Sequence, residues 1–234
     1  MTFSITARCR QTGQFGIAVS TKVPAVGSLC PYVEAGVGAI ASQSYVNPYI
    51  GIHGLKYLKE GLSAEQTLEK ILQEEKIPEI RQFSIVDKTG KAVAYTGEKC
   101  LDWHGHLVGD HVAVAGNLLV GEATIQHMLE VFEQTEQSDM SLAARLLQAL
   151  EAGQKAGGDR RGRQSAALKV VGTEAYPLVD LRVDEHVDPV KELRRIYEIA
   201  REELFPFVSS LPTYQHPTGR LDDVTKRELK LDVD

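Results

Sequence analysis

The chain opens with the stretch Met1-Thr2-Phe3-Ser4-Ile5-Thr6-Ala7. Its apolar side chains occupy the odd positions and its hydroxyl side chains the even ones. A period of two is typical of a β-strand with one face in the core and the other in solvent, so the stretch predicts a half-buried strand. The pattern begins at once, and we expect no signal peptide.

Thr2 is the first candidate for chemistry. An initiator methionine is normally removed before a small side chain, which would leave threonine at the N-terminus with a hydroxyl and an amine on adjacent carbons. The amine can then act as general base for its own hydroxyl. An α-amino group has an ordinary pKa of about 7.7–8.0, so a small decrease leaves it neutral and basic. The alternative interpretation is an edge strand with an ordinary terminus.

Composition narrows the classes of function. The 234 residues carry a formal net charge of −6, which argues against nucleic acid or an anionic membrane as the main partner. No apolar run approaches the roughly 18 residues of a membrane-spanning helix. The three cysteines, Cys9, Cys30 and Cys100, have neither metal nor redox spacing. They indicate a reducing cytoplasm and reduced, buried thiols.

Further along the chain, strands and helices alternate in groups. Period-two or small apolar segments predict further strands at 16–20, 36–43, 83–86, 92–95, 112–115, 166–171 and 178–183. Helices are expected at 55–59, after the capping box that begins at Ser63, along the apolar stripes 125–132 and 142–150, and from the Asp188-Pro189 pair to Leu204.

The order of these elements predicts the fold class. Strands that come in runs favour antiparallel sheets over a doubly wound parallel sheet. We therefore expect an α+β fold in which two antiparallel sheets stack face to face, with helix pairs on both outer faces, a four-layer αββα sandwich. Residues 1–204 would form this single domain, and 205–234 an arm or tail over the surface or onto a partner subunit.

Several stretches, in this order, resemble the domain of unknown function 1028 family over roughly residues 2–200. The most specific is Gly157-Gly158-Asp159-Arg160-Arg161-Gly162-Arg163-Gln164-Ser165. Supporting stretches are Thr2 to Ile5, Gly16 to Lys22, Gly36 to Gln43 with Asn47-Pro48, Gly116-Asn117, and Leu181 to Asp184 with Asp188-Pro189. More distantly, the order is similar to the N-terminal-nucleophile (Ntn) hydrolase fold of proteasome β-subunits, in which the nucleophile opens the first strand.

This resemblance implies further site residues. Proteasome subunits place an aspartate and a serine near the threonine amine, and Asp159 and Ser165 have the matching type and setting. The catalytic lysine of those subunits has no clear match, and Lys22 is the residue assigned that role here. The candidates for oxyanion or substrate contact are Ser42 and Gln43, on a strand expected to flank the first, together with Asn47, Asn117 and Gln164.

Charged and histidine-rich loops leave two alternatives open. Arg161 and Arg163 would hold a substrate carboxylate bidentately, or instead pair with Asp159 or a neighbouring subunit. His104 and His106 could share one face of a strand as metal ligands, but no third ligand is near in sequence. We therefore expect a turn with solvated histidines and no metal.

Together these features predict a cytoplasmic N-terminal-threonine amidohydrolase. Thr2 would attack a small, carboxylate-bearing amide, and water would clear the acyl-enzyme without a cofactor. The alternative is a binding or assembly module with the same fold and no turnover, in which the arm from Phe205 makes a subunit contact. In either case a homo-oligomer is expected.

Overall fold

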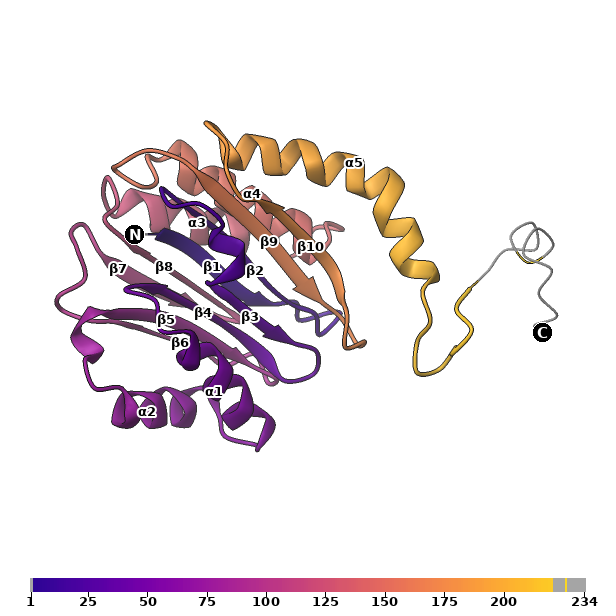
Figure 1. Cartoon of the computed structure of the whole chain (residues 1–234), viewed down its shortest axis with the longest axis horizontal. Helices are drawn as coiled ribbons and strands as arrows, with labels where there is room; N and C mark the ends of the chain where they lie inside the picture. The colour runs from indigo at the N-terminus through magenta and orange to yellow at the C-terminus, as the bar shows by residue number, and fades with distance from the viewer. Residues whose placement is uncertain (1, 221–225, 227–234) are drawn as a thin grey trace.

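Two antiparallel sheets form the centre of the fold in the computed structural model, which describes residues 2–220 and 226 (Figure 1). The six-stranded sheet has the spatial order β10 (Pro177–Val183), β9 (Ser165–Val171), β2 (Phe15–Thr21), β1 (Thr2–Arg8), β8 (Val112–Asn117) and β7 (Gly105–Gly109). The four-stranded sheet has the order β3 (Pro31–Glu34), β4 (Gly38–Ser44), β5 (Arg81–Asp87) and β6 (Ala92–Thr96).

Five helices cover the outer faces of the sheets. They are α1 (Pro48–Lys59), α2 (Ala64–Glu74), α3 (Ala123–Gln134), α4 (Leu142–Lys155) and α5 (Pro189–Ser210). α1 and α2 pack on the four-stranded sheet, whereas α3, α4 and α5 pack on the six-stranded one. One apolar cluster lies under each helical layer, and a third lies between the sheets. The αββα sandwich predicted from the order of elements is confirmed.

β1 is more deeply placed than its alternation predicted. It pairs with β2 on one side and β8 on the other, so the edge-strand alternative is wrong. Phe3, Ile5 and Ala7 point into the cluster under the helices. The hydroxyl face is buried as well, with Ser4 and Thr6 at 0% exposure, because it lies against the second sheet and not against solvent. The prediction of a half-buried strand is therefore wrong.

Other differences from the expected elements have local causes. β3 and β7 were not predicted, because β3 has only four residues and begins with Pro31, and β7 begins and ends with glycine, so neither has a run of β-forming residues. The expected turn at the two histidines is wrong from Gly105 on, where β7 begins. The first helix begins at Pro48 because Asn47 caps it by accepting from the backbone N–H of Tyr49.

The last helix continues past the expected end at Leu204 and includes Pro206. Proline costs a helix one hydrogen bond, but Phe205 packs edge-on against Tyr197 at 5.6 Å and holds the next turn in place. The Asp188-Pro189 pair does open the helix, although the Asp188 side chain makes no capping bond. No helix among the described residues is long and apolar enough to span a membrane.

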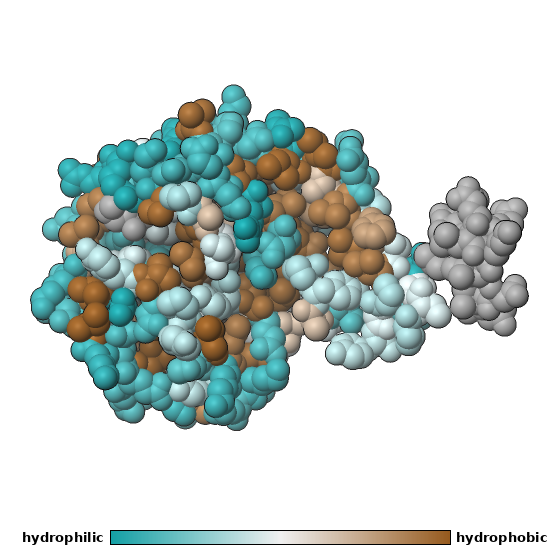
Figure 2. Space-filling model, in the orientation of Figure 1, coloured by the Kyte–Doolittle hydropathy of each residue, from teal (hydrophilic) through white to brown (hydrophobic). Residues whose placement is uncertain are grey.

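The end of α5 extends past the sheets (Figure 1). Hydrophobic side chains gather along the stretch where it leaves the sandwich (Figure 2). They include Leu204, 40% exposed, and Phe207, 61% exposed. The predicted arm from Phe205 therefore begins as helix, and part of it, at 221–225 and 227–234, lies outside the described residues. Its role as a subunit contact stays a prediction.

We expect wild-type protein to sediment as a homo-oligomer and Phe207→Glu to shift it towards monomer. A charge at this exposed apolar position would have to be desolvated in a contact between copies. Analytical ultracentrifugation across a range of concentrations measures the effect. Val187→Glu, at an 85% exposed site before α5, is the matched control and should change nothing. A monomeric wild type would contradict the expectation.

Candidate active site

Thr2 lies at the first position of the central strand and is only 5% exposed. Its Oγ1 donates to Oγ1 of Thr21, the last residue of β2, at 3.3 Å. On the other side it is in register with Asn117, the last residue of β8. The hydroxyl is thus held on the inter-sheet face at one end of the sandwich. Met1 lies outside the described residues, so its removal stays a prediction.

The ladder also orients the main-chain nitrogen of Thr2. The Arg8 N–H donates to the carbonyl oxygen of His111 at 2.9 Å, six residues further along the same β1–β8 pairing. Hydrogen-bonded pairs alternate along an antiparallel ladder, so Thr2 and Asn117 occupy the same type of position. The Thr2 nitrogen therefore lies in the sheet plane opposite the Asn117 backbone, whereas both side chains point towards the second sheet.

Asp159 anchors the end of β2. It is 3% exposed, and its carboxylate accepts from the backbone N–H of Lys22 at 2.9 Å and from the Arg161 guanidinium at 2.8 Å. Lys22 directly follows Thr21, whose hydroxyl accepts from Thr2. Asp159 therefore fixes the backbone next to this partner of Thr2. The Lys22 ammonium donates to the carbonyl oxygen of Arg163 at 3.2 Å, on the loop before β9.

Ser165 is fully buried but serves a different part of the chain. Its Oγ donates to the Val23 carbonyl at 2.6 Å and accepts from the Val26 N–H at 3.1 Å. Both bonds fix the loop after β2, including the short 3₁₀ helix Val26–Ser28. The neighbouring Gln164 contributes a backbone N–H to the Thr21 carbonyl at 3.0 Å. These contacts give both residues a structural role.

Two of the three arginines of the loop bind carboxylates of the chain itself. Arg161 holds Asp159, one of the alternatives left open by the sequence. Arg163 Nη1 donates to Asp188 Oδ1 at 2.9 Å, at the start of α5. A substrate carboxylate at either guanidinium would have to compete with an aspartate already in place.

Ser42 and Gln43 are not where the sequence placed them. Their strand, β4, faces β1 across the sandwich and does not flank it. The Ser42 N–H donates to the Cys30 carbonyl at 3.0 Å, so it is not a free oxyanion donor. The Gln43 side chain accepts from Ser4 Oγ at 2.6 Å and donates to Gln82 Oε1 at 2.8 Å. Its role is in a polar network between the sheets.

Gln82 is the centre of this network, and backbone carbonyls fix its orientation. Its Nε2 donates to the carbonyl oxygens of Gly116 at 2.8 Å and Gly105 at 3.1 Å, atoms that can only accept. Its Oε1 must therefore accept, and it does so from Gln43 and from Asn117 Nδ2 at 2.7 Å. This chain of donors and acceptors determines which end of each amide points where.

Asn117 is left with one unpaired atom. Because its Nδ2 is committed to Gln82, its Oδ1 points elsewhere, and it is buried without a hydrogen-bond partner. A buried acceptor without a partner costs about 1–3 kcal/mol. Asn117 also lines a cavity of about 180 Å³, together with Ser44, Tyr45 and Leu101. The register partner of Thr2 thus carries a buried, unpaired acceptor, and the same residue lines a small cavity.

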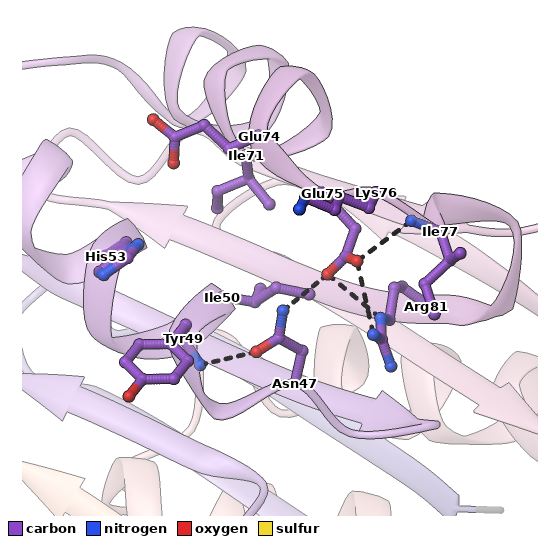
Figure 3. Close-up of a pocket in the computed structure, with 10 residues that line it drawn as sticks. All are labelled: Asn47, Tyr49, Ile50, His53, Ile71, Glu74, Glu75, Lys76, Ile77 and Arg81. Carbon is purple, nitrogen blue, oxygen red and sulfur yellow. Dashed lines mark hydrogen bonds and ion pairs between the residues drawn. The ribbon is translucent and has the colours of Figure 1, made fainter.

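Asn47 belongs to a different cavity, of about 470 Å³, between α1, α2 and the start of β5 (Figure 3). Its Nδ2 donates to Glu75 at 2.6 Å, and Glu75 forms an ion pair with Arg81 at 3.1 Å. Arg81 donates in turn to the Tyr45 carbonyl at 2.6 Å. These polar groups of the larger cavity already pair with one another. Asn47 is one of them and does not line the cavity at Asn117, so it is not part of the Thr2 site.

The cysteines and histidines offer no second reactive centre. All three thiols are free and buried. Burial raises the pKa of Cys30 to about 12 and also raises that of Cys100. His106 lies on β7, where its Nδ1 contacts Thr96 Oγ1 at 2.8 Å. No group of three metal-ligating side chains comes together within the part of the chain that the structure describes.

Comparison with known proteins identifies the family of this chain. Residues 2–193 match DUF1028, a family of unknown function. The chain belongs to this family. A crystal structure of the DUF1028 protein SPO2555 from Silicibacter pomeroyi matches with a TM-score of 0.86 and 29% identity, over 95% of this chain and 96% of that one. A search of curated proteins finds no match.

Two weaker structural matches are to Anbu, an ancestral beta-subunit. The protein from Yersinia bercovieri matches with a TM-score of 0.39 and 10% identity, over 90% of this chain and 98% of that one. A Gly-1 mutant from Hyphomicrobium sp. strain MC1 gives 0.41 and 12%, over 88% and 97%. At TM-scores below 0.5 these matches carry no weight, and the fold assignment rests on the sheets themselves.

Sequence reasoning missed two residues of this DUF1028 site, Thr21 and Gln82. Thr21 could have been found by counting outward from the hairpin turn at residues 10–14, which brings the end of the second strand opposite the start of the first. Gln82 precedes the predicted strand 83–86, and nothing in its local pattern marks it as the centre of a network.

Ser165→Ala should lower the free energy of unfolding by about 1–3 kcal/mol, because the buried Val26 N–H loses its acceptor. Chemical denaturation measures the change. Ser28→Ala is the control, since that exposed hydroxyl donates to the Ala25 carbonyl in the same loop and its loss should cost less than about 0.5 kcal/mol. Unchanged stability in Ser165→Ala would contradict the structural role.

Glu75 predicts an acid-sensitive contribution to stability. Burial opposes its charge, but the hydrogen bonds from Asn47, Arg81 and the Ile77 N–H outweigh that cost and lower its pKa below the ordinary value of 4.5. A carboxylate with a lowered folded pKa stabilises fully above its unfolded pKa, and the contribution is lost as pH falls through the folded pKa. Glu75→Gln should therefore lower Tm near neutral pH and flatten its decline in acid.

Circular dichroism melts from about pH 3 to 7 measure that difference. Glu74→Gln is the matched control, since Glu74 lines the same cavity and accepts from the Tyr57 hydroxyl. Parallel curves for wild type and Glu75→Gln would contradict the expected linkage.

Proposed function

We propose that this DUF1028 protein is an N-terminal-threonine amidohydrolase that cleaves a small amide through an acyl-enzyme. The observation that carries the proposal is the setting of Thr2. Its hydroxyl is buried at the start of the central strand and bonded to the Thr21 hydroxyl, and its register partner Asn117 lines a cavity of about 180 Å³. Removal of Met1 would place a free amine on the carbon next to the one that bears this hydroxyl.

The chemistry then follows in two steps. Thr2 Oγ1 attacks the amide carbonyl while its proton passes to the neutral α-amine, and the C–N bond breaks as the amine returns that proton to the leaving nitrogen. Water attacks the resulting ester, gives its proton to the same amine, and releases the acid and the Thr2 hydroxyl. Atoms and charge balance without a cofactor.

Neighbouring residues have positioning roles in this scheme. The main chain of Asn117 lies opposite the Thr2 nitrogen and would anchor the amine in the sheet plane. Thr21 keeps the Thr2 hydroxyl in one orientation. Asp159 and Arg161 hold the end of β2 that carries Thr21. Neither Ser165 nor Lys22 is needed as a proton carrier.

The expected carboxylate on the substrate is not part of this proposal. Arg161 and Arg163 are the groups that would bind it, and both already bind aspartates of the chain. The pair of Arg163 with Asp188 is partly exposed, with side chains at 42% and 33%, so it contributes at most about 1 kcal/mol. A small amide is the substrate class that this geometry favours.

We expect the purified protein to lack Met1 and a β-lactone to form an ester on Thr2 Oγ1. Intact mass and peptide mass spectrometry measure both. Thr2→Ser should retain labelling, whereas Thr2→Ala should abolish it and stay within about 1 kcal/mol of wild-type stability. Thr21→Val, which removes only the hydroxyl partner, should slow labelling by at least about tenfold.

The cysteines serve as an internal control for labelling. Cys30 and Cys100 are buried with raised pKa values and should remain unlabelled. A retained methionine, or equal labelling of wild type and Thr2→Ala, would leave the non-catalytic binding or assembly module as the better account of this fold.

A further inference from the structure

We propose that two copies of this chain pair along the edge strand β10, so that their six-stranded sheets join into one continuous sheet across a two-fold axis. The partner is a second copy of the chain, and the contact does not depend on hydrolysis at Thr2. The expected homo-oligomer thereby acquires a specific interface and a specific register.

β10 is an unpaired edge. It is the last strand on one side of the six-stranded sheet and pairs with β9. Among the described residues, no backbone group of Pro177–Val183 bonds to a segment other than β9. A seven-residue edge of this kind presents a row of N–H and C=O groups that a second strand can satisfy.

The sequence of β10 is self-complementary around Leu181. In Val179-Asp180-Leu181-Arg182-Val183, two valines enclose a pair of opposite charges. An antiparallel pair with its two-fold axis at Leu181 places Asp180 opposite Arg182 of the second copy. The same register places Val179 opposite Val183 on the other face. Opposite charges and apolar side chains at directly opposed positions both stabilise a strand pair.

The neighbouring registers bring like charges together. A continuous sheet that keeps the helices of both copies on one face requires the axis to pass through a residue, which then lies opposite itself. With the axis at Asp180, two carboxylates would face each other. With the axis at Arg182, two guanidinium groups would do so, and Asp180 would lie opposite Asp184. Like charges in such positions are destabilising, so the charges select the axis at Leu181.

The two charged side chains also have partners within their own copy. Asp180 forms an ion pair with Lys169 at 3.3 Å, and Arg182 forms one with Asp184 at 2.9 Å. Their side chains remain 39% and 40% exposed. A carboxylate has two oxygens and a guanidinium five N–H donors, so each can accept a second partner. Across the junction these groups form a row of alternating sign, which suits an identical strand.

α5 supplies a second part of the interface, because it packs on β10 and β9 and extends past the sheet (Figure 1). Arg194 marks the flank of α5 that faces α4, since its Nε donates to Glu151 at 2.7 Å. At about 100° per residue, Ile199 and Phe207 lie on the opposite flank, which faces outward over the β10 edge.

This outward flank is apolar and accessible. Ile199 is 42% exposed and Phe207 61%, and hydrophobic side chains gather along the same stretch of α5 (Figure 2). When two β10 strands pair, the α5 helices of both copies meet on one face of the joined sheet. The second copy then covers side chains that are otherwise in contact with water.

Sedimentation of charge variants tests the register. We expect wild type to form a dimer, and Asp180→Arg or Arg182→Asp alone to raise its dissociation constant at least about tenfold, because the two-fold axis creates two like-charge contacts from one substitution. The double variant restores opposite charges and should recover most of the affinity. Lys169→Ala is the matched control, since it removes only the partner of Asp180 within the chain and should leave the dimer unchanged.

A monomeric wild type, or a double variant as weak as the single ones, would overturn the proposal. Circular dichroism melts of all variants separate a lost contact between copies from a lost fold.

Cysteine crosslinking locates the axis. In the proposed register the two Leu181 Cα atoms lie about 4.5–5.5 Å apart, within the range of a disulfide. Leu181→Cys should therefore form a covalent dimer with oxidised glutathione, whereas the natural thiols are buried and should stay unlinked. Val183→Cys is the matched control, because the two Val183 positions would lie about 14 Å apart along the strands. Equal crosslinking of both variants, or of neither in a dimeric protein, would also overturn the proposal.

Discussion

The hydroxyl face of β1 lies against the second sheet, and this contact constrains most of what surrounds it. Buried polar groups must find hydrogen-bond partners, and here they find them across the sandwich, from Ser4 to Gln43 and between Thr6 and Ser84. A slip of one residue would turn Phe3 and Ile5 towards these polar side chains and the hydroxyls into the apolar cluster under the helices. The register of β1, and with it the place of Thr2, is fixed by residues further along the strand.

The polar groups that face β1 do not all find hydrogen-bond partners, and the two ends of the strand differ in this respect. At the Thr6 end a single hydroxyl pair closes the contact. At the Thr2 end, the amide side chains of Gln43 and Asn117 both donate to that of Gln82, and this arrangement leaves the oxygen of Asn117 without a partner. A buried acceptor without a partner is a local cost to folding, and such costs persist where the surrounding structure enforces them.

The sequence predicted the layers of the fold because each layer leaves its own periodic pattern. Apolar stripes marked α3 and α4, and the capping box at Ser63 marked α2. The site was less accessible to such reasoning. Thr2 was identified from its position and type alone, but the partners of Asp159 and Ser165 depend on loop conformations that no period encodes.

Long-range contacts account for the remaining errors. Alternation in β1 says that two faces differ, but it cannot say whether the polar face meets solvent or a second polar surface. Whether that face is buried depends on Gln43 and Gln82, which lie about 40 and 80 residues further along the chain. Neither residue belongs to a sequence pattern that would reveal this contact.

The arginine-rich loop shows how the surrounding charges define the site. Three arginines in a chain of net charge −6 suggested an anion-binding surface. Two of them are instead used within the fold, since Arg161 binds the aspartate that anchors β2 and Arg163 binds the aspartate at the start of α5. Because these guanidinium groups are already paired, neither can hold a substrate carboxylate without displacing an aspartate of the chain. What the fold supplies at Thr2 is orientation, since the Thr21 hydroxyl bonds the Thr2 side chain and the Asn117 backbone lies opposite its nitrogen.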